Sequence, residues 1–166
     1  MNLEEYPELA YVNPNNLNRV LRLNNFHSNI KDEMFSPNGD SQILDGDWDL
    51  DLSISFEKLD VFESIYSHFI EKESWNKTSL YSRVSSEIID NKIKWGCKTP
   101  EEYLNRLNEN IDSLYIDIKN NGFKTQNQLG SSKTSDEVRV GIDRNGEFIF
   151  MDGRHRLAIA KILKLE

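Results

Sequence analysis

The chain has 166 residues, of which 37% are hydrophobic, and this length and composition allow one folded domain with a buried core. Its 28 acidic residues outnumber its 20 basic residues, and a formal net charge of −8 argues against a general nucleic-acid-binding protein, which carries a basic face. The single cysteine, Cys97, excludes an intrachain disulfide and a cysteine-rich zinc site. We expect a cytoplasmic protein without a membrane partner, because the sequence contains no bilayer-length apolar run and its start does not resemble a signal peptide.

The N-terminal region is polar and contains the turn signals NPNN at 13–16 and SPNGD at 36–40. Between them, the apolar spacing of LNRVLRL predicts a short helix over 17–23. The following segment, QILDGDWDLDLS, predicts a brief strand that runs into an acidic turn around Trp48.

Apolar residues then recur at helical spacing, which predicts helices over 60–72 and from about 77 to 89. The clearest helix begins at TPEE, where Thr99 is expected to be the N-cap with a capping box to Glu102, and proline suits the first helical position. Its apolar stripe continues for several turns, and Gly122 is expected to end it in a left-handed conformation.

Two β-rich runs flank the segment DRNG, and its Asn145–Gly146 pair predicts a type I′ hairpin turn. The second run, 147–151, leads to Asp152 and Gly153, after which an amphipathic helix is expected. We therefore predict a single α/β (α+β) domain over residues 1–166. It would comprise a helical front half at about 1–98 and a core with a small mixed sheet at about 99–166.

The start of the last expected helix carries the densest basic cluster of the chain, in the sequence DGRHR. A helix N-terminus suits an anion, Arg154 and Arg156 supply permanently charged fork-shaped donors, and Gly153 allows close approach to the backbone. His155 is a candidate phosphate donor or proton carrier, and Asp152 is a candidate to hold Mg²⁺, accept a hydroxyl proton or orient an arginine. The alternative is a solvated basic turn in which Asp152 is an ordinary N-cap.

Other segments offer weaker candidates. Asp47 and Asp49, in DGDWDLD, are candidate Mg²⁺ ligands beside nucleotide phosphates, although a solvated acidic turn anchored by a buried Trp48 is the favoured interpretation. Lys124 and Thr125 follow the Gly122 stop and are candidate phosphate contacts, or else exposed loop residues. Trp95, in WGCKTP, is a candidate to stack on a base or cap a cleft.

A family resemblance rests on these same residues. The segment EFIFMDGRHRLAIAKIL resembles the second conserved box of the ParB/sulfiredoxin-like superfamily, in which a strand ends in a Gly-x-(His/Arg)-Arg turn that opens a helix. Upstream, IDSLYIDIKNNGFKTQNQL is similar to the helix and Asn-Gly segment of ParB-like domains, so the resemblance spans about 111–165. It implies a ParB/sulfiredoxin-like core that binds ATP, ADP or CTP through Gly153, Arg154, His155 and Arg156.

Within this superfamily the box favours one branch. Arg154 stands where sulfiredoxins have a cysteine, so sulfinic acid reduction is not expected. Partitioning ParB proteins continue after the box into a DNA-binding region, whereas this acidic chain ends soon after it, so a role in chromosome partitioning is not expected either. The box is most similar to the Asp-Gly-His-His-Arg of the free-serine kinase branch, and Asp152 matches its aspartate, but the catalytic glutamate of that branch has no aligned counterpart.

The resemblance therefore implies a nucleotide-dependent phosphotransferase that acts on a small hydroxylated molecule. Its cofactors would be ATP and Mg²⁺, and Asp152 and His155 would be its catalytic residues. The alternatives are a nucleotide- or partner-binding module without turnover and a metal-dependent nuclease of the ParB-like type. The sequence does not predict the oligomeric state.

Overall fold

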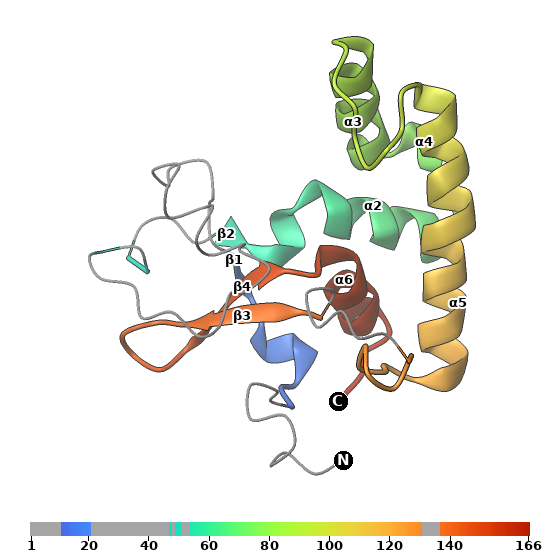
Figure 1. Cartoon of the computed structure of the whole chain (residues 1–166). Helices are drawn as coiled ribbons and strands as arrows, with labels where there is room; N and C mark the ends of the chain where they lie inside the picture. Colours follow the sequence, from blue (N-terminus) through green and yellow to red (C-terminus); the bar gives the residue numbers. More distant parts are fainter. Residues whose placement is uncertain (1–10, 21–46, 48, 51–53, 131–136) are drawn as a thin grey trace.

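The computed structural model describes residues 11–20, 47, 49–50, 54–130 and 137–166 (Figure 1). These residues form an α+β fold, as the sequence predicted. The helical elements, including short 3₁₀ helices and one π-helical segment, are η2 (Pro14–Asn16), η4 (Phe56–Lys58), α2 (Asp60–Phe69), η5 (Trp75–Lys77), α3 (Ser79–Ile89), α4 (Pro100–Arg106), the π-helical η6 (Leu107–Ile111), α5 (Asp112–Asn121) and α6 (Arg154–Ile162). The strands are β1 (Arg19–Val20), β2 (Ile54–Ser55), β3 (Arg139–Ile142) and β4 (Phe148–Asp152).

The described strands form one four-stranded sheet in the order β2-β1-β4-β3. Strand β1 runs parallel to β4, with Val20 opposite Phe150, whereas β2 pairs antiparallel with β1 and β3 pairs antiparallel with β4. The sheet is therefore small and mixed, which confirms the expected fold class. Because β1 lies beside β4, a strand from the front of the chain completes the sheet that leads into α6 (Figure 1).

The predicted helix over 17–23 is wrong at its described residues. Leu17 ends the short helix η2, and Arg19 and Val20 form β1. Their backbone pairing with β2 and β4, and the burial of Val20 in the core, outweigh the weak local helical spacing. The strand predicted within 42–53 lies almost wholly outside the described residues.

The long helical predictions are confirmed. Helices α2 and α3 occupy the two segments expected from their apolar spacing, and α6 begins directly after Gly153. The helix predicted from Thr99 runs to Asn121 through α4, η6 and α5, and its π-helical turn was not predicted. Gly122 ends it at φ 77° and ψ 174°, so φ is positive as expected but ψ lies outside the left-handed helical region.

The cap of this helix is the one that the sequence indicated. The Thr99 side chain accepts a hydrogen bond from the backbone N–H of Glu102 at 3.1 Å, and Pro100 occupies the first helical position. The Glu102 carboxylate accepts a hydrogen bond from the backbone N–H of Lys98 at 2.6 Å. These two bonds satisfy backbone donors that the helix itself leaves unpaired.

The β3–β4 hairpin is confirmed, but its predicted type I′ turn is wrong. A type I′ turn needs positive φ at both central residues, and among the described residues of this turn only Gly146, at φ 83°, has one. Gly146 N–H instead donates to the carbonyl of Asp143 at 2.9 Å, and the Asp143 carboxylate accepts 2.8 Å hydrogen bonds from Asn145 and Glu147 N–H. The aspartate therefore stabilises a three-residue loop with glycine in its last position.

Helix α6 lies at the centre of the packing. It contacts α2 and α5, while the strand that precedes it is interior to the sheet (Figure 1). Ala158, Ile159 and Ala160 of α6 are buried, and small side chains here let neighbouring elements approach closely. The α6 N-terminus is thereby held between the sheet and the helices that come from 60–121.

Candidate functional site

The DGRHR turn lies where β4 ends and α6 begins, as the sequence indicated. Gly153 is the N-cap residue, with a left-handed backbone at φ 88° and ψ 31°, and its N–H donates to Oδ1 of Asp152 at 2.7 Å. The N–H groups of the first helical turn have no partner within a helix, and the macrodipole places positive charge there. The local geometry therefore suits an anion.

The glycine at this turn has a packing reason. A methyl group at Gly153 would lie 2.8 Å from the Cα of Val138 and 3.1 Å from its Cγ2. The start of α6 thus packs directly against the backbone that enters β3. The glycine is explained by this contact and by its positive φ, whether or not an anion approaches it.

Arg156 points into the protein. Its guanidinium forms an ion pair with Glu137 at 3.1 Å, donates to the carbonyl oxygen of Lys124, and lies 4.2 Å from the ring centroid of Phe123. Only 8% of the residue is exposed. These contacts connect α6 to the segment after α5 and to the start of β3, so Arg156 holds together the loops around the turn.

Arg154 and Asp152 have fewer internal contacts. Within the described part of the chain, no hydrogen bond or ion pair engages the guanidinium of Arg154 or the Oδ2 atom of Asp152. Both residues are half-buried. A guanidinium and a carboxylate oxygen are therefore available to a ligand beside the α6 N-terminus.

His155 faces a second feature, a cavity of about 130 Å³. Its wall is formed by Trp95, Tyr103, Arg106, Leu107, Asn110, Ile111 and His155. The His155 ring lies 5.8 Å from the Trp95 ring, and the Trp95 ring lies 5.5 Å from that of Tyr103. Trp95 therefore lines a cavity next to the basic box, in agreement with its candidacy as a residue that caps a cleft.

Two polar atoms in this wall are buried and unpaired. Within the described part of the chain, His155 Nε2 and Tyr103 Oη have no hydrogen-bond partner, and Tyr103 is fully buried. Burial lowers the pKa of His155 to about 4, with further lowering by the charges of Arg154 and Arg106, against smaller opposing effects of Asp60 and Asp152. Burial also raises the pKa of Tyr103. Both side chains are therefore uncharged near neutral pH and able to donate or accept.

The turn that carries Trp95 is strained. Lys94 and Cys97 form a short antiparallel bridge, and both residues between them have positive φ, 49° at Trp95 and 80° at Gly96. Positive φ is rare for a residue with a bulky side chain and is found preferentially where a side chain must be held in one place. The strain fixes the indole at the mouth of the cavity. Cys97 itself is buried.

Lys124 and Thr125 lie in the loop that follows α5 and contacts Arg156 of α6. The Lys124 carbonyl oxygen receives the Arg156 guanidinium, so its backbone is tied to α6. The Thr125 hydroxyl accepts the backbone N–H of Gln128 at 3.2 Å, and the Gln128 side chain accepts the Thr125 N–H at 2.8 Å. Thr125 therefore stabilises its own turn, while the prediction that the two residues contact phosphate stays a prediction.

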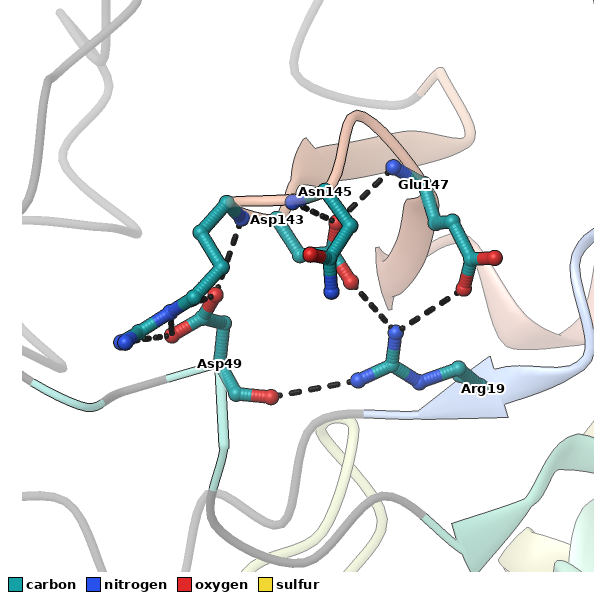
Figure 2. A network of polar contacts seen from close by, with 6 residues as sticks. Arg19, Asp49, Asp143, Asn145 and Glu147 are labelled. Atoms are coloured by element: carbon teal, nitrogen blue, oxygen red, sulfur yellow. Dashed lines mark hydrogen bonds and ion pairs between the residues drawn. The ribbon is translucent and has the colours of Figure 1, made fainter.

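Asp49 lies in a different network, at the β3–β4 turn (Figure 2), and Asp47 pairs with an arginine of the same network. The Asp49 carboxylate accepts hydrogen bonds from the Arg144 guanidinium, the shortest 2.6 Å, and from its backbone N–H at 2.9 Å. Asp47 pairs with the same guanidinium at 3.1 Å. These hydrogen bonds to Arg144 hold the pKa of Asp49 far below its usual range.

Arg19 connects this network to the sheet. Its guanidinium forms a 2.5 Å ion pair with Asp143 and donates to the Asp49 carbonyl oxygen at 3.1 Å (Figure 2). The network lies at the end of the hairpin opposite Asp152, so the structure does not bring the acidic pair together with the basic box. A cation at Asp49 would compete with a guanidinium, and no group of three metal-ligating side chains occurs among the described residues.

A larger cavity, of about 460 Å³, lies between α2 and the start of α3. Two of its hydroxyls are paired: the Ser64 hydroxyl accepts the Leu80 N–H at 3.0 Å, and the Thr78 hydroxyl donates to the Trp75 carbonyl at 2.7 Å. Its wall also includes the carboxylates of Glu57, Glu63 and Glu73. None of its described lining residues has a buried polar atom without a partner, whereas the smaller cavity has two, and we take the smaller cavity as the candidate site.

Tyr103 and Arg106 were not identified from the sequence as site residues. Tyr103 belongs to the apolar stripe that predicted the helix from Thr99, and such a stripe indicates a core position. Its hydroxyl acquires a role only through its neighbours Trp95 and His155, which the fold supplies. The sequence did contain one indication of a site: Tyr103 is a tyrosine within an apolar stripe, and a buried tyrosine hydroxyl usually has a hydrogen-bond partner.

Comparisons with known proteins leave the family open: no family model, no curated protein and no solved structure matches this chain. Of the helices that the structure describes, none has the length and apolar character to cross a membrane.

Proposed function

We propose that the protein binds the phosphate groups of a nucleotide at the N-terminus of α6 and uses the nucleotide as a phosphoryl donor. The observation that carries this proposal is a concentration of positive charge. Arg154 and Arg106 are both close enough to His155 to lower its pKa, and the α6 macrodipole adds positive potential at the same point. Such a concentration in an acidic protein is most simply explained by an anionic ligand.

The resemblance to the ParB/sulfiredoxin-like superfamily supports the same ligand class. The order of elements expected from that resemblance, a helix, an Asn-Gly stop, two hairpin strands, the box and a helix, matches α5, Gly122, β3, β4 and α6. In that superfamily the box contacts nucleotide phosphates. A cytoplasmic location agrees with such a ligand and stays a prediction from the sequence.

Each residue of the box has a distinct proposed role. Arg154 and the N–H groups of the first turn of α6 bind the phosphates, and Arg156 positions the Lys124 loop rather than contacting the ligand. Asp152 Oδ2 accepts the proton of the substrate hydroxyl, whose oxygen attacks the terminal phosphorus while the bond to the departing diphosphate breaks. Neutral His155 donates a hydrogen bond to the reacting oxygens. Catalysis is then mainly positioning and electrostatic stabilisation.

Mg²⁺ is the metal that such a transfer uses, since it neutralises charge on the phosphates. In the described structure, Asp47 and Asp49 are engaged by Arg144 and do not fit this role, because their oxygens face a cation already. Asp152 is the carboxylate beside the α6 N-terminus with an oxygen available. Because this oxygen is the proposed acceptor of the hydroxyl proton, we propose that the nucleotide phosphates themselves hold Mg²⁺ beside the α6 N-terminus.

Thermal denaturation with ATP, ADP, CTP or GTP, with and without Mg²⁺, tests the nucleotide site. We expect at least one nucleotide to raise the Tm of the wild type, and Arg154→Gln to weaken its binding by roughly tenfold to a hundredfold, the value of one charged hydrogen bond. Lys119→Gln removes one positive charge from the exposed surface of α5 and is the matched control. Unchanged Tm with every nucleotide, or unchanged binding by Arg154→Gln, would contradict the proposal.

A binding module without turnover is the second candidate, and the placement of Arg156 favours it. Because Arg156 pairs with Glu137, one of the two arginines in the box is already neutralised inside the protein. Fewer cations then remain to stabilise a transferring phosphoryl group. Incubation of the nucleotide-bound protein with a panel of alcohols separates the candidates: release of ADP supports the transferase, and stable binding without release supports the module.

A further inference from the structure

The cavity at His155 combines features that the phosphate site does not use. Tyr103 lies at its inner wall, fully buried, with its hydroxyl unpaired among the described residues. His155 Nε2 is buried and unpaired in the same wall. Leaving a buried polar atom without a partner costs about 1–3 kcal/mol, so two such atoms in residues that line one cavity point to a polar ligand there.

The lining of the cavity also defines the charge of its ligand. The lining contains one charged side chain, Arg106, which is exposed at the mouth together with Asn110. None of the lining residues is acidic. Leu107 and Ile111 supply an apolar floor. Within the lining, an ammonium group would therefore meet a cation, whereas a carboxylate would meet a guanidinium and an amide. The carboxylates of Asp60 and Asp152, which act on the charge of His155, do not line the cavity.

The cavity size limits the ligand further. About 130 Å³ corresponds to roughly four water molecules at their volume in the liquid, which is too small for a nucleoside. The helix that forms one wall is π-helical over Leu107–Ile111, an arrangement that occurs frequently at functional sites. This π-helical segment and the last turn of α4 together supply Tyr103, Arg106 and Asn110 to the cavity wall.

We propose that this cavity binds a small hydroxylated carboxylate, with its carboxylate at Arg106 and Asn110 and its hydroxyl at the buried Tyr103 Oη and His155 Nε2. Binding requires no nucleotide. That the bound hydroxyl is also the phosphoryl acceptor rests on the proposed function. The cavity is titrated in nucleotide-free protein, so a failed titration contradicts the cavity proposal without contradicting the nucleotide site.

The test uses the indole N–H signal of Trp95 in ¹⁵N NMR spectra, assigned with the variant Trp95→Phe. The probes are glycerate, which has both groups, and three partial mimics: propionate without a hydroxyl, glycerol without a carboxylate, and serine with an ammonium group in place of one hydroxyl. We expect glycerate to shift the signal saturably and each mimic to bind roughly tenfold or more weakly, the value of one lost polar contact. Absence of a saturable glycerate shift, or serine binding as tightly as glycerate, would overturn the proposal.

Tyr103→Phe provides the decisive variant, because it removes only the unpaired hydroxyl. The ring and its packing remain, so we expect the Tm of the ligand-free protein to stay equal or rise, while glycerate binding weakens about tenfold. Tyr81→Phe is the matched control: its ring stacks on Tyr103 at 6.1 Å between centroids but does not line the cavity, and it should leave binding unchanged. Wild-type affinity in Tyr103→Phe would refute the assigned contact.

Discussion

At the start of α6, two arginines that are two residues apart have different surroundings. Positions i and i+2 on a helix point about 200° apart, so one side chain of the pair faces inward when the other faces outward. Arg156 lies against Glu137 and Phe123, whereas Arg154 makes no ion pair within the described chain. The composition of the box identified both as phosphate ligands, but the helical geometry assigns them to two different tasks.

These surroundings predict that substitution of Arg156 reduces stability, whereas substitution of Arg154 reduces nucleotide binding. Arg156→Ala should reduce the free energy of unfolding by about 3 kcal/mol, because it leaves the half-buried Glu137 carboxylate without its charged partner and, among the described residues, with only the hydrogen bond from Gln126 N–H. Arg154→Ala should change that free energy by less than about 0.5 kcal/mol while weakening nucleotide binding. Urea denaturation of both variants, followed by circular dichroism, measures the difference. Equal stability losses would show that both arginines are structural.

The neutral imidazole of His155 predicts a pH dependence of stability. Its folded-state pKa is about 4 and its unfolded value is 6.5, so between these values the unfolded chain takes up a proton that the folded protein does not. Stability should therefore fall as the pH falls from 6.5 to 4, by at most about 3 kcal/mol from this group. The neighbouring charged residues, Arg154, Arg106, Asp60 and Asp152, are present both in the wild type and in a variant that lacks the imidazole, so a comparison of the two isolates the contribution of His155.

The variant His155→Asn isolates this contribution, since asparagine does not titrate. Its free energy of unfolding, measured in urea at pH 4, 5, 6 and 7, should decrease less toward low pH than that of the wild type. The His155 imidazole signal in NMR should titrate with a midpoint near 4. A midpoint near 6.5, or identical pH profiles, would mean that the imidazole is not desolvated in the folded protein.

At the level of elements, the contact between the α6 N-terminus and the start of β3 depends on one glycine. Gly153→Ala places a methyl group 2.8 Å from the Val138 backbone and also forces alanine into a positive φ. We expect a loss of about 2–4 kcal/mol in the free energy of unfolding, the conformational cost plus the clash. Gly146→Ala is the matched control, because φ there, 83°, is similarly positive but the space is empty.

The control should cost only about 1 kcal/mol, the conformational part alone. Chemical denaturation of the two variants therefore separates strain from contact. Similar costs at both positions would show that the β3 backbone moves away from α6 without penalty. In that case the packing explanation of Gly153 would fail, and the glycine would have to be explained by its ligand.

Elements that depend on local signals were predicted well. The helix from Thr99 was recognised because its cap, its proline and its apolar stripe all lie within a few residues of one another. Strand β1 was missed because its two residues become a strand only by pairing with Phe150 and Ile54, which are far away in the sequence. The hairpin turn was assigned to the wrong type because the side chain of Asp143, rather than Asn145–Gly146 alone, determines its hydrogen bonds.

The candidate site divides in the same way. Asp152 and the three basic residues after Gly153 were found because strand, glycine and helix start follow one another directly in the sequence. The direction in which Arg156 and His155 point depends on Glu137, Trp95 and Tyr103, and no local pattern contains that information. Sequence reasoning therefore located the candidate site but did not resolve its two halves, the DGRHR turn and the cavity.

Across the whole molecule, the front of the chain supplies parts that the C-terminal portion lacks. Strand β4 lies between β1 and β3, so it has a partner from each part of the chain. On α6, the buried Lys161 ammonium donates to Asn18 Oδ1 at 2.8 Å and to the Pro14 carbonyl at 3.2 Å. Burial lowers the pKa of this lysine, and these oxygens compensate for its lost hydration. Trp95 adds a wall of the cavity.

These contacts predict that residues 99–166 do not fold alone. Such a fragment would expose an edge of β4, remove the oxygen partners of the Lys161 ammonium and the α2 contact of α6, and open the cavity at His155. We expect no cooperative urea transition and no near-ultraviolet circular dichroism for the fragment. The full chain should unfold in one transition that coincides by tryptophan fluorescence and far-ultraviolet circular dichroism, because the sheet and α6 couple both parts.

A cooperatively folding 99–166 fragment would instead mean that β3, β4 and α6 form a self-sufficient unit on the α4–α5 helix. The front half would then be an addition to the DGRHR turn rather than part of its framework, and Trp95 would line the cavity without being needed for the fold.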